Sequence, residues 1–144
     1  MTIRKSVVIE RSPEIAFRIF CDKIGQWWPK GPSFGGKNLT DMVIEGRVGG
    51  RFFERYEDGT EFEIGRVTTY EPPTKVAFTW RAPSWDQATD VEIRFTPEAA
   101  GTRVELEHRG WEKSEKIMDG RKSYDGGWDF VLGHYVKHAA AARE

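Results

Sequence analysis

Apolar and polar residues alternate along residues 3–9, which predicts that the chain opens with a strand buried on one side. Ser12 and Pro13 then predict a helix start, because serine favours the N-cap and proline tolerates the first helical position. Apolar residues at helical spacing continue this helix to residue 20, and residues 22–28 predict a second short helical piece. The predicted order at the N-terminus is therefore strand, helix, helix.

A loop and a series of strands are predicted next. Residues 29–37 contain two prolines and three glycines, so we expect a loop with Phe34 at its tip, in a position that would suit a lid. Strand-like runs follow at Asp41–Gly46, Arg51–Glu57, Glu61–Tyr70, Lys75–Arg81, Asp90–Thr96 and Thr102–Arg109. Turn residues separate these runs at hairpin spacing, which predicts an antiparallel meander.

The last three predicted strands have one apolar and one charged face. The apolar positions are Val76, Phe78, Trp80, Val91, Ile93, Phe95, Thr102, Val104, Leu106 and His108. A helix that covers this face is predicted at Asp125–Ala142, from a stripe of Tyr124, Trp128, Val131, Leu132, Tyr135, Val136 and Ala139. We therefore predict one α+β domain over residues 1–144, with a curved antiparallel sheet of about seven strands, two short N-terminal helices and a long C-terminal helix.

The net charge and the length of the apolar runs indicate which classes of partner the sequence does not favour. Lysine and arginine total 22 against 23 aspartates and glutamates, so the formal charge of −1 favours neither nucleic acid nor an anionic membrane as a partner. The sequence has no run of about 18 apolar residues that would predict a membrane span. The single cysteine, Cys21, suits a reducing compartment, and we expect a cytoplasmic protein.

The chain is rich in aromatic residues, with six Trp, nine Phe and four Tyr. Each ring buries roughly 150–250 Å² in a folded protein. The rings therefore either pack a very aromatic core or line a cavity, and composition leaves both interpretations open.

Several short motifs occur in the same order as in the members of a known protein family. They are Ser12–Phe17, Gly49–Phe53, Asp58–Gly59, Gly65–Val67, Tyr70–Pro73, Val76–Trp80, Gly101–Val104 and Gly127–Trp128. With these motifs the chain resembles the activator-of-Hsp90-ATPase-like (AHSA1-like) branch of the SRPBCC, or START/Bet v 1-like, superfamily. The resemblance spans nearly the whole chain and implies the helix-grip fold, in which a sheet wraps around the closing helix. Relatives use the gap between them for lipids, sterols, polyketides and other apolar molecules.

Three functional hypotheses follow from this resemblance. The leading one is a domain that binds a small apolar or aromatic molecule in the gap, with no cofactor and no metal. The second is a protein-interaction module of the co-chaperone type that stimulates Hsp90. The third is a cyclase-like or aromatase-like enzyme in which His108, Arg66 or Tyr56 moves protons. A monomer and a homodimer are both compatible with the sequence.

The ligand-binding residues are predicted from the inward faces, with Trp28 and Phe34 near the mouth of the gap. Arg66 is included because a buried guanidinium there would pair with a ligand carboxylate or with Glu54. The full set is Trp28, Phe34, Arg66, Phe78, Trp80, His108, Trp128, Leu132 and Tyr135. The alternative is that the same rings simply fill the space.

His108 is the most plausible base among the three groups of the enzyme hypothesis, because alternation places an imidazole on the apolar face of the last strand. Such a group would serve as a general base or orient a ligand carbonyl. The alternative, a neutral core histidine with its hydrogen bonds made inside the protein, is the commoner arrangement.

Other suggestive residues predict no site. His134 and His138 have metal-ligand spacing but lie off the apolar stripe. Gly31–Lys37 matches the first positions of a phosphate-binding loop, yet Asn38 stands where a serine or threonine would bind magnesium. Cys21 is expected to be a small buried thiol.

Overall fold

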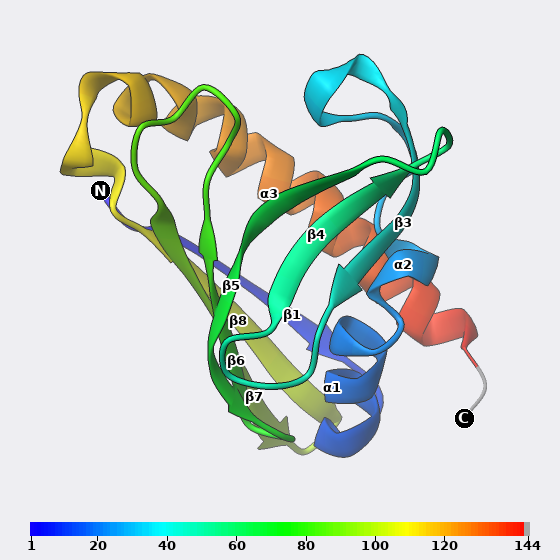
Figure 1. Cartoon of the computed structure of the whole chain (residues 1–144). Coiled ribbons are helices and arrows are strands. Elements are labelled where there is room, and N and C mark those ends of the chain that lie inside the picture. The colour runs from blue at the N-terminus through cyan, green and yellow to red at the C-terminus, as the bar shows by residue number, and fades with distance from the viewer. Residues whose placement is uncertain (143–144) are drawn as a thin grey trace.

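A computed structural model describes residues 1–142 and confirms the α+β helix-grip architecture (Figure 1). The elements in chain order are β1 (Ile3–Ile9), α1 (Pro13–Cys21), α2 (Ile24–Trp27), β2 (Gly31–Pro32), η1 (Phe34–Gly36), β3 (Asn38–Ile44), β4 (Arg51–Tyr56), β5 (Glu61–Glu71), β6 (Lys75–Trp80), β7 (Thr89–Glu98), β8 (Gly101–Arg109), η2 (Trp111–Lys113) and α3 (Glu115–Ala141).

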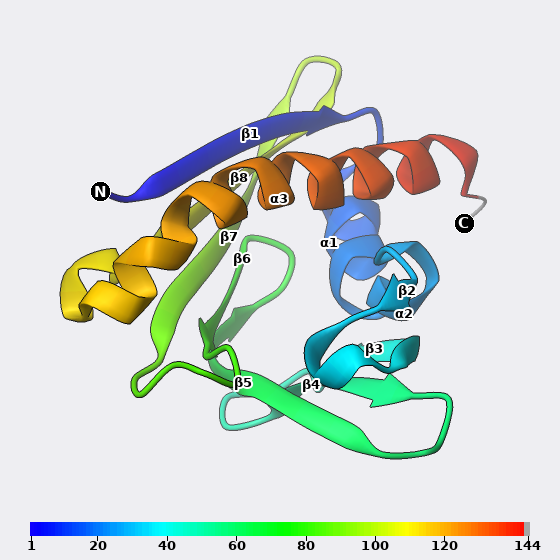
Figure 2. The same cartoon turned by 90° about the horizontal axis from the view of Figure 1, so that it is seen from above.

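The strands form one antiparallel sheet in the order β1-β8-β7-β6-β5-β4-β3-β2. The predicted meander is confirmed from β3 to β8, and the two-residue strand β2 extends it by one short strand at the edge. β1 pairs with β8, from Ile3 opposite His108 to Ile9 opposite Thr102, so the first and last strands are neighbours. The sheet curls, and α3 runs along its concave side next to β1 (Figure 2).

The predicted inner face of β6, β7 and β8 is confirmed, because every apolar position predicted on these three strands is buried. The outer faces of these strands carry ion pairs, such as Arg94 with Glu92 and Glu107. The hydrophobic core therefore lies between the concave face of the sheet and the buried stripe of α3.

The closing helix is longer than predicted, since α3 begins at Glu115 instead of Asp125. Ser114 caps it by accepting a hydrogen bond from the backbone nitrogen of Ile117 at 3.2 Å. The early part was missed because glycine and charged residues weaken the apolar period there. Tertiary contacts stabilise it instead: Ile117 is fully buried, and a Cβ on Gly120 would lie only 3.3 Å from the Trp85 ring.

The two short helices close one end of the sheet (Figure 1). Ser12 is the N-cap of α1, as predicted, and its hydroxyl accepts from the Ile15 nitrogen at 3.3 Å. The hydroxyl of Tyr135 on α3 donates to the carbonyl of Ala16 at 2.6 Å, which ties α1 to the closing helix. Within residues 1–142, no helix combines the length and the apolar character that a bilayer span requires.

Candidate functional site

The predicted gap between the sheet and α3 is filled by aromatic side chains. Trp80 lies at the centre, with ring centroids 5.4 Å from Trp128, 5.7 Å from Phe52 and Tyr124, and 6.3 Å from Trp28. We call these rings, together with His108 and Trp111, the aromatic cluster. Neither Trp80 nor Trp128 lines any of the five pockets described for residues 1–142. The predicted open cavity is therefore not confirmed, and the contacts between the rings match the alternative in which they fill the space.

His108 is a fully buried part of this cluster, at 0% exposure. Its Nδ1 accepts a hydrogen bond from the indole nitrogen of Trp128 at 3.0 Å, and its Nε2 lies 2.7 Å from the hydroxyl of Thr89. That hydroxyl donates to the carbonyl of Trp80 at 2.8 Å, so it accepts from Nε2, and the ring is the neutral Nε2–H tautomer. Burial lowers the pKa of His108 to about 3. The protein uses both nitrogens, which matches the alternative of a structural core histidine.

The indole nitrogens of Trp111 and Trp80 in the cluster also form hydrogen bonds within the protein. The indole nitrogen of Trp111 donates to the His108 carbonyl at 2.9 Å, and that of Trp80 donates to the Tyr124 hydroxyl at 2.9 Å. Within residues 1–142, every buried side-chain nitrogen and oxygen has a hydrogen-bond partner. This part of the cluster is therefore built as a core, not as a set of groups awaiting a ligand.

Three further predicted ligand contacts lie in the core away from the loop 29–37. Phe78 packs against Phe52 with ring centroids 4.5 Å apart, and Leu132 is 2% exposed on the inner side of α3. Tyr135 contacts Phe20 at 5.1 Å, beside the short helices. The structure therefore divides the predicted set between a packed core and a smaller group near the loop.

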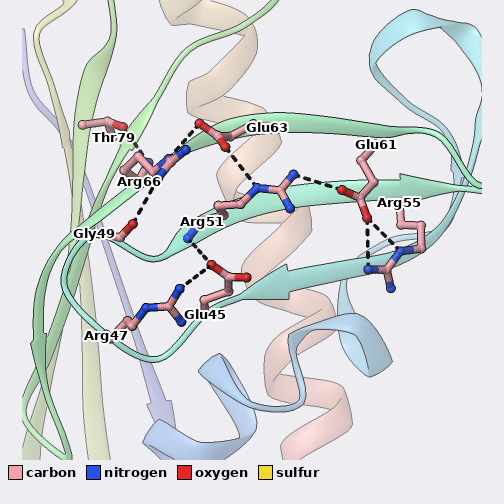
Figure 3. A network of polar contacts seen from close by, with 9 residues as sticks. All are labelled: Glu45, Arg47, Gly49, Arg51, Arg55, Glu61, Glu63, Arg66 and Thr79. Carbon is pink, nitrogen blue, oxygen red and sulfur yellow. Dashed lines mark hydrogen bonds and ion pairs between the residues drawn. The ribbon is translucent and has the colours of Figure 1, made fainter.

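Arg66 lies on the outer face of the sheet, not in the interior (Figure 3). Its Nε donates to Glu63 at 2.9 Å and its Nη1 donates to the Gly49 carbonyl at 3.3 Å, within a network of arginines and glutamates. The side chain is 56% exposed. The prediction of an inward guanidinium is therefore corrected, and Glu54 is not its partner.

A β-bulge in β5 explains this reversal. In the register, Phe52 pairs with Gly65 and Phe53 pairs with Glu63, so Ile64 is an extra residue on its strand. Ile64 and Gly65 are consequently both buried, and the alternation after them is shifted by one position. Arg66 then faces outward, although strict alternation from Phe62 places it inside.

Phe34 and Trp28 lie near the open end of the cluster, and both are half-buried. The Phe34 ring contacts Phe62 at 5.3 Å and Trp80 at 6.3 Å between centroids. Beside it lies a mostly apolar surface pocket of about 250 Å³, which we call the mouth pocket. It is lined by Phe34, Lys37, Tyr56, Thr60, Glu61, Phe62 and Pro83.

Next to the mouth pocket lies a buried carboxylate, Glu54, which is 2% exposed. Its Oε1 accepts a hydrogen bond from the Tyr56 hydroxyl at 2.6 Å, and its Oε2 accepts one from the Ser33 hydroxyl at 2.6 Å. No lysine or arginine forms an ion pair with it among the pairs described for residues 1–142. Burial of a carboxylate without a cation is costly, so such a group is a candidate for a functional role.

Tyr56 is held as a hydrogen-bond donor by this arrangement. Burial and the bond to Glu54 raise the pKa of its hydroxyl, which keeps the proton on the tyrosine. The charge of Glu54 also contributes, after burial, to raising the pKa of the Tyr124 hydroxyl in the aromatic cluster. The charge of Glu54 is thus felt at Tyr124 in the aromatic cluster.

Sequence reasoning named Glu54 only as a partner for Arg66 and Tyr56 only as one of three groups that move protons. A signal was present, because Phe52, Glu54 and Tyr56 share one parity of β4 and Phe52 belongs to the core. An acidic residue at an inward position of a strand is the pattern that identifies this site.

The remaining motifs that the sequence suggested do not form a further site. Within residues 1–142, no three histidine, cysteine or carboxylate side chains are grouped to hold a metal ion. The loop with partial likeness to a phosphate-binding motif forms β2 and η1, and it leads into β3 instead of a helix. Cys21 is buried, and burial raises the pKa of its thiol.

Comparison with protein families decides the affiliation of the chain. The family model described as activator of Hsp90 ATPase homolog 1-like protein matches residues 10–138. The chain belongs to the AHSA1-like family. The resemblance predicted from the motifs is thereby confirmed. No curated protein sequence matches the chain significantly.

Solved structures of similar proteins support the AHSA1-like fold over the full length. Protein MLL2253 from Mesorhizobium loti shares 19% identity with a TM-score of 0.76, covering 100% of both chains. The AHSA1-like protein from Aeromonas hydrophila shares 24% identity with a TM-score of 0.70, covering 98% of this chain and 93% of that one. Txn09, described as an anthrahydroquino-γ-pyrone synthase, shares 38% identity with a TM-score of 0.54, covering 74% of this chain and 75% of that one.

Proposed function

We propose that this AHSA1-like protein binds a planar aromatic small molecule under the loop 29–37, at the mouth of the aromatic cluster. The observation that carries the proposal is the position of Phe34, whose ring lies on Phe62 and Trp80 beside the mouth pocket. A ligand ring that takes the place of Phe34 would meet the same two aromatic surfaces.

The backbone of the loop is paired with the sheet over a short stretch only. Its short strand β2 pairs with β3 only at Gly31 opposite Leu39 and Pro32 opposite Asn38. Gly31 and Gly36 have φ values of 116° and 74°, which glycine adopts without strain and which make both residues suitable hinges. Removal of the Phe34 ring would enlarge the mouth pocket toward the roughly 300–1,000 Å³ of typical ligand sites.

The similarity to Txn09 supports a class of ligand. That protein is described as an anthrahydroquino-γ-pyrone synthase, and its 38% identity extends over 74% of this chain. A polycyclic aromatic compound of the polyketide type is therefore the ligand class that we propose. A cyclase-like reaction on such a compound is the second candidate, favoured by the description of Txn09 as a synthase.

Titration with 2-naphthol, followed by the indole N–H signals in nuclear magnetic resonance spectra, tests the proposal. We expect saturable shifts of the Trp80 and Trp28 signals. Phe34→Ala should bind about three- to tenfold more tightly, because the ligand no longer displaces a ring contact of about 0.5–1.5 kcal/mol. Phe130→Ala is the matched control, since Phe130 is 63% exposed on α3 and should leave the affinity unchanged. Absence of saturable shifts in all three proteins would favour the protein-interaction hypothesis instead.

A further inference from the structure

Glu54 occupies an unusual position in the fold, because its inward side chain lies between apolar neighbours. In the sheet register it stands opposite Met42 of β3 and opposite Phe62 of β5. Met42 is 1% exposed, and Phe62 is half-buried against Phe34. The carboxylate is thus placed at the boundary between the core and the mouth pocket.

The two hydrogen bonds to Glu54 come from elements that differ in how firmly they are held. Tyr56 lies two positions along the same strand, inside the paired part of β4, and its hydroxyl donates to Oε1. Ser33 lies in the loop that carries Phe34, and its hydroxyl donates to Oε2. Movement of the loop with Phe34 would therefore leave Oε1 bonded and remove the donor from Oε2.

A carboxylate oxygen without a donor in an apolar site is unfavourable, because hydrogen bonds to charged groups contribute about 1.5–3 kcal/mol. A ligand that enters when the loop moves would offset this loss if it brought its own hydroxyl group. A ligand carboxylate placed against Oε2 of Glu54 would instead meet like charge. Among the ion pairs described for residues 1–142, the cation that lines the mouth pocket, Lys37, pairs with Asp58 and not with Glu54.

Glu54 accepts hydrogen bonds on both carboxylate oxygens, from Tyr56 at Oε1 and from Ser33 at Oε2, which the single amide oxygen of a glutamine could not do. A carboxylate also forms shorter and stronger bonds with hydroxyl donors than an amide does. The same strong acceptor becomes available to a hydroxyl group of a ligand when the Ser33 hydroxyl moves away.

We propose that Glu54 is the recognition group of the mouth site, and that its Oε2 accepts a hydrogen bond from a hydroxyl of the bound aromatic molecule in place of Ser33. This inference rests on the proposed function and names the ligand as a neutral hydroxyaromatic compound. Tyr56 positions the carboxylate from the opposite side through its bond to Oε1.

Two matched probes distinguish recognition of a hydroxyl group by Glu54 from binding of the aromatic rings alone. 2-Naphthol carries the hydroxyl, whereas 2-methoxynaphthalene has the same ring system without a donor. Dissociation constants are measured at neutral pH for the wild-type protein, for Glu54→Gln and for the control Glu63→Gln. Glu63 lies on the outer face of β5, where it pairs with Arg51 and Arg66.

We expect the wild type and Glu63→Gln to prefer 2-naphthol by about tenfold or more, as a charged hydrogen bond predicts. In Glu54→Gln the preference should fall below about threefold, because 2-naphthol loses its charged acceptor, while the affinity for the methyl ether should not decrease. Equal affinities for the two probes in the wild type would overturn the inference while leaving the proposed function intact. A parallel loss of both affinities in Glu54→Gln would also overturn it, since that result indicates a structural role.

Ser33→Ala provides a second test that keeps Glu54 in place. Binding of 2-naphthol no longer competes with the Ser33 hydroxyl, so its affinity should rise at least about threefold. An unchanged or weaker affinity would contradict the exchange of donors. If neither probe binds any of these proteins, the proposed function itself fails, and the inference fails with it.

Discussion

The indole nitrogen of Trp128 donates its hydrogen to Nδ1 of His108 across 3.0 Å, linking α3 to the last strand of the sheet. Because Nδ1 must accept, a proton on it would break this bond and place a charge in a buried ring cluster. The second nitrogen is bonded to Thr89. The packing between helix and sheet therefore depends on a neutral imidazole.

This dependence predicts a loss of stability in acid. The folded pKa of His108, about 3, lies below its ordinary value of 6.5, so the unfolded chain binds one more proton between these limits. The free energy of unfolding should therefore fall as the pH falls from 6.5 toward 3, by up to about 1.4 kcal/mol per pH unit from this residue. Above pH 6.5, His108 does not contribute to the pH dependence of the free energy of unfolding.

Urea unfolding at pH 7 and pH 5 measures this effect. The stability lost between these two values should be about 2 kcal/mol greater for the wild type than for His108→Gln. His134→Gln is the control, since His134 is exposed on α3, and it should lose as much as the wild type. Identical losses for the wild type and His108→Gln would contradict the prediction.

The bond between Tyr56 and Glu54 predicts coupling between the two residues. Tyr56→Phe should lower the free energy of unfolding by about 1.5–3 kcal/mol, the range for a hydrogen bond to a charged group. In the Glu54→Gln background the same change should cost only about 1 kcal/mol. Urea unfolding of the four proteins gives the coupling energy. Tyr135→Phe, which removes a bond to the neutral Ala16 carbonyl, should cost the same in both backgrounds.

Substitution by alanine should have opposite effects on stability at Gly65 and at Gly133. A Cβ at Gly65 would lie 1.8 Å from the Thr79 carbonyl oxygen, so Gly65→Ala should destabilise the protein by about 3 kcal/mol or more. A Cβ at Gly133 in α3 meets nothing within 4 Å, and Gly133→Ala should stabilise the protein by about 0.5–1 kcal/mol. Thermal unfolding of both variants provides the comparison, and a tolerated Gly65→Ala would argue against the bulge in β5.

The outward position of Arg66 predicts that this residue does not contribute to ligand binding. Arg66→Ala should change the dissociation constant for 2-naphthol by less than about twofold. Its ion pair with Glu63 is exposed and screened by solvent, so the free energy of unfolding should change little. A tenfold loss of affinity would show that Arg66 reaches the ligand and would restore the sequence-based prediction.

Much of the fold was predictable because its signals are local. The alternation in β6, β7 and β8, the cap at Ser12 and the apolar stripe of α3 each follow from residues close together in the chain. The start of α3 was not predictable in this way, because the packing of Ile117 and Gly120 against distant residues stabilises it.

The candidate site was less predictable, because a single shift of register reverses a side chain. The bulge at Ile64 turns Arg66 outward, and it depends on the pairing of β4 with β5 and not on either strand alone. Glu54 could be assigned to the inner face from its parity with Phe52. Its two hydroxyl partners could not be assigned as readily, since Ser33 reaches it from a separate loop.

The family, the order of the elements and the inward-facing rings could be inferred from motifs and from the period along the chain. Whether those rings pack against one another could not be inferred in this way. That outcome depends on how Trp80, Trp128 and His108 pack across elements distant in the chain, and on whether their polar atoms find partners there. Such contacts are properties of surfaces that meet in three dimensions, and no local pattern encodes them.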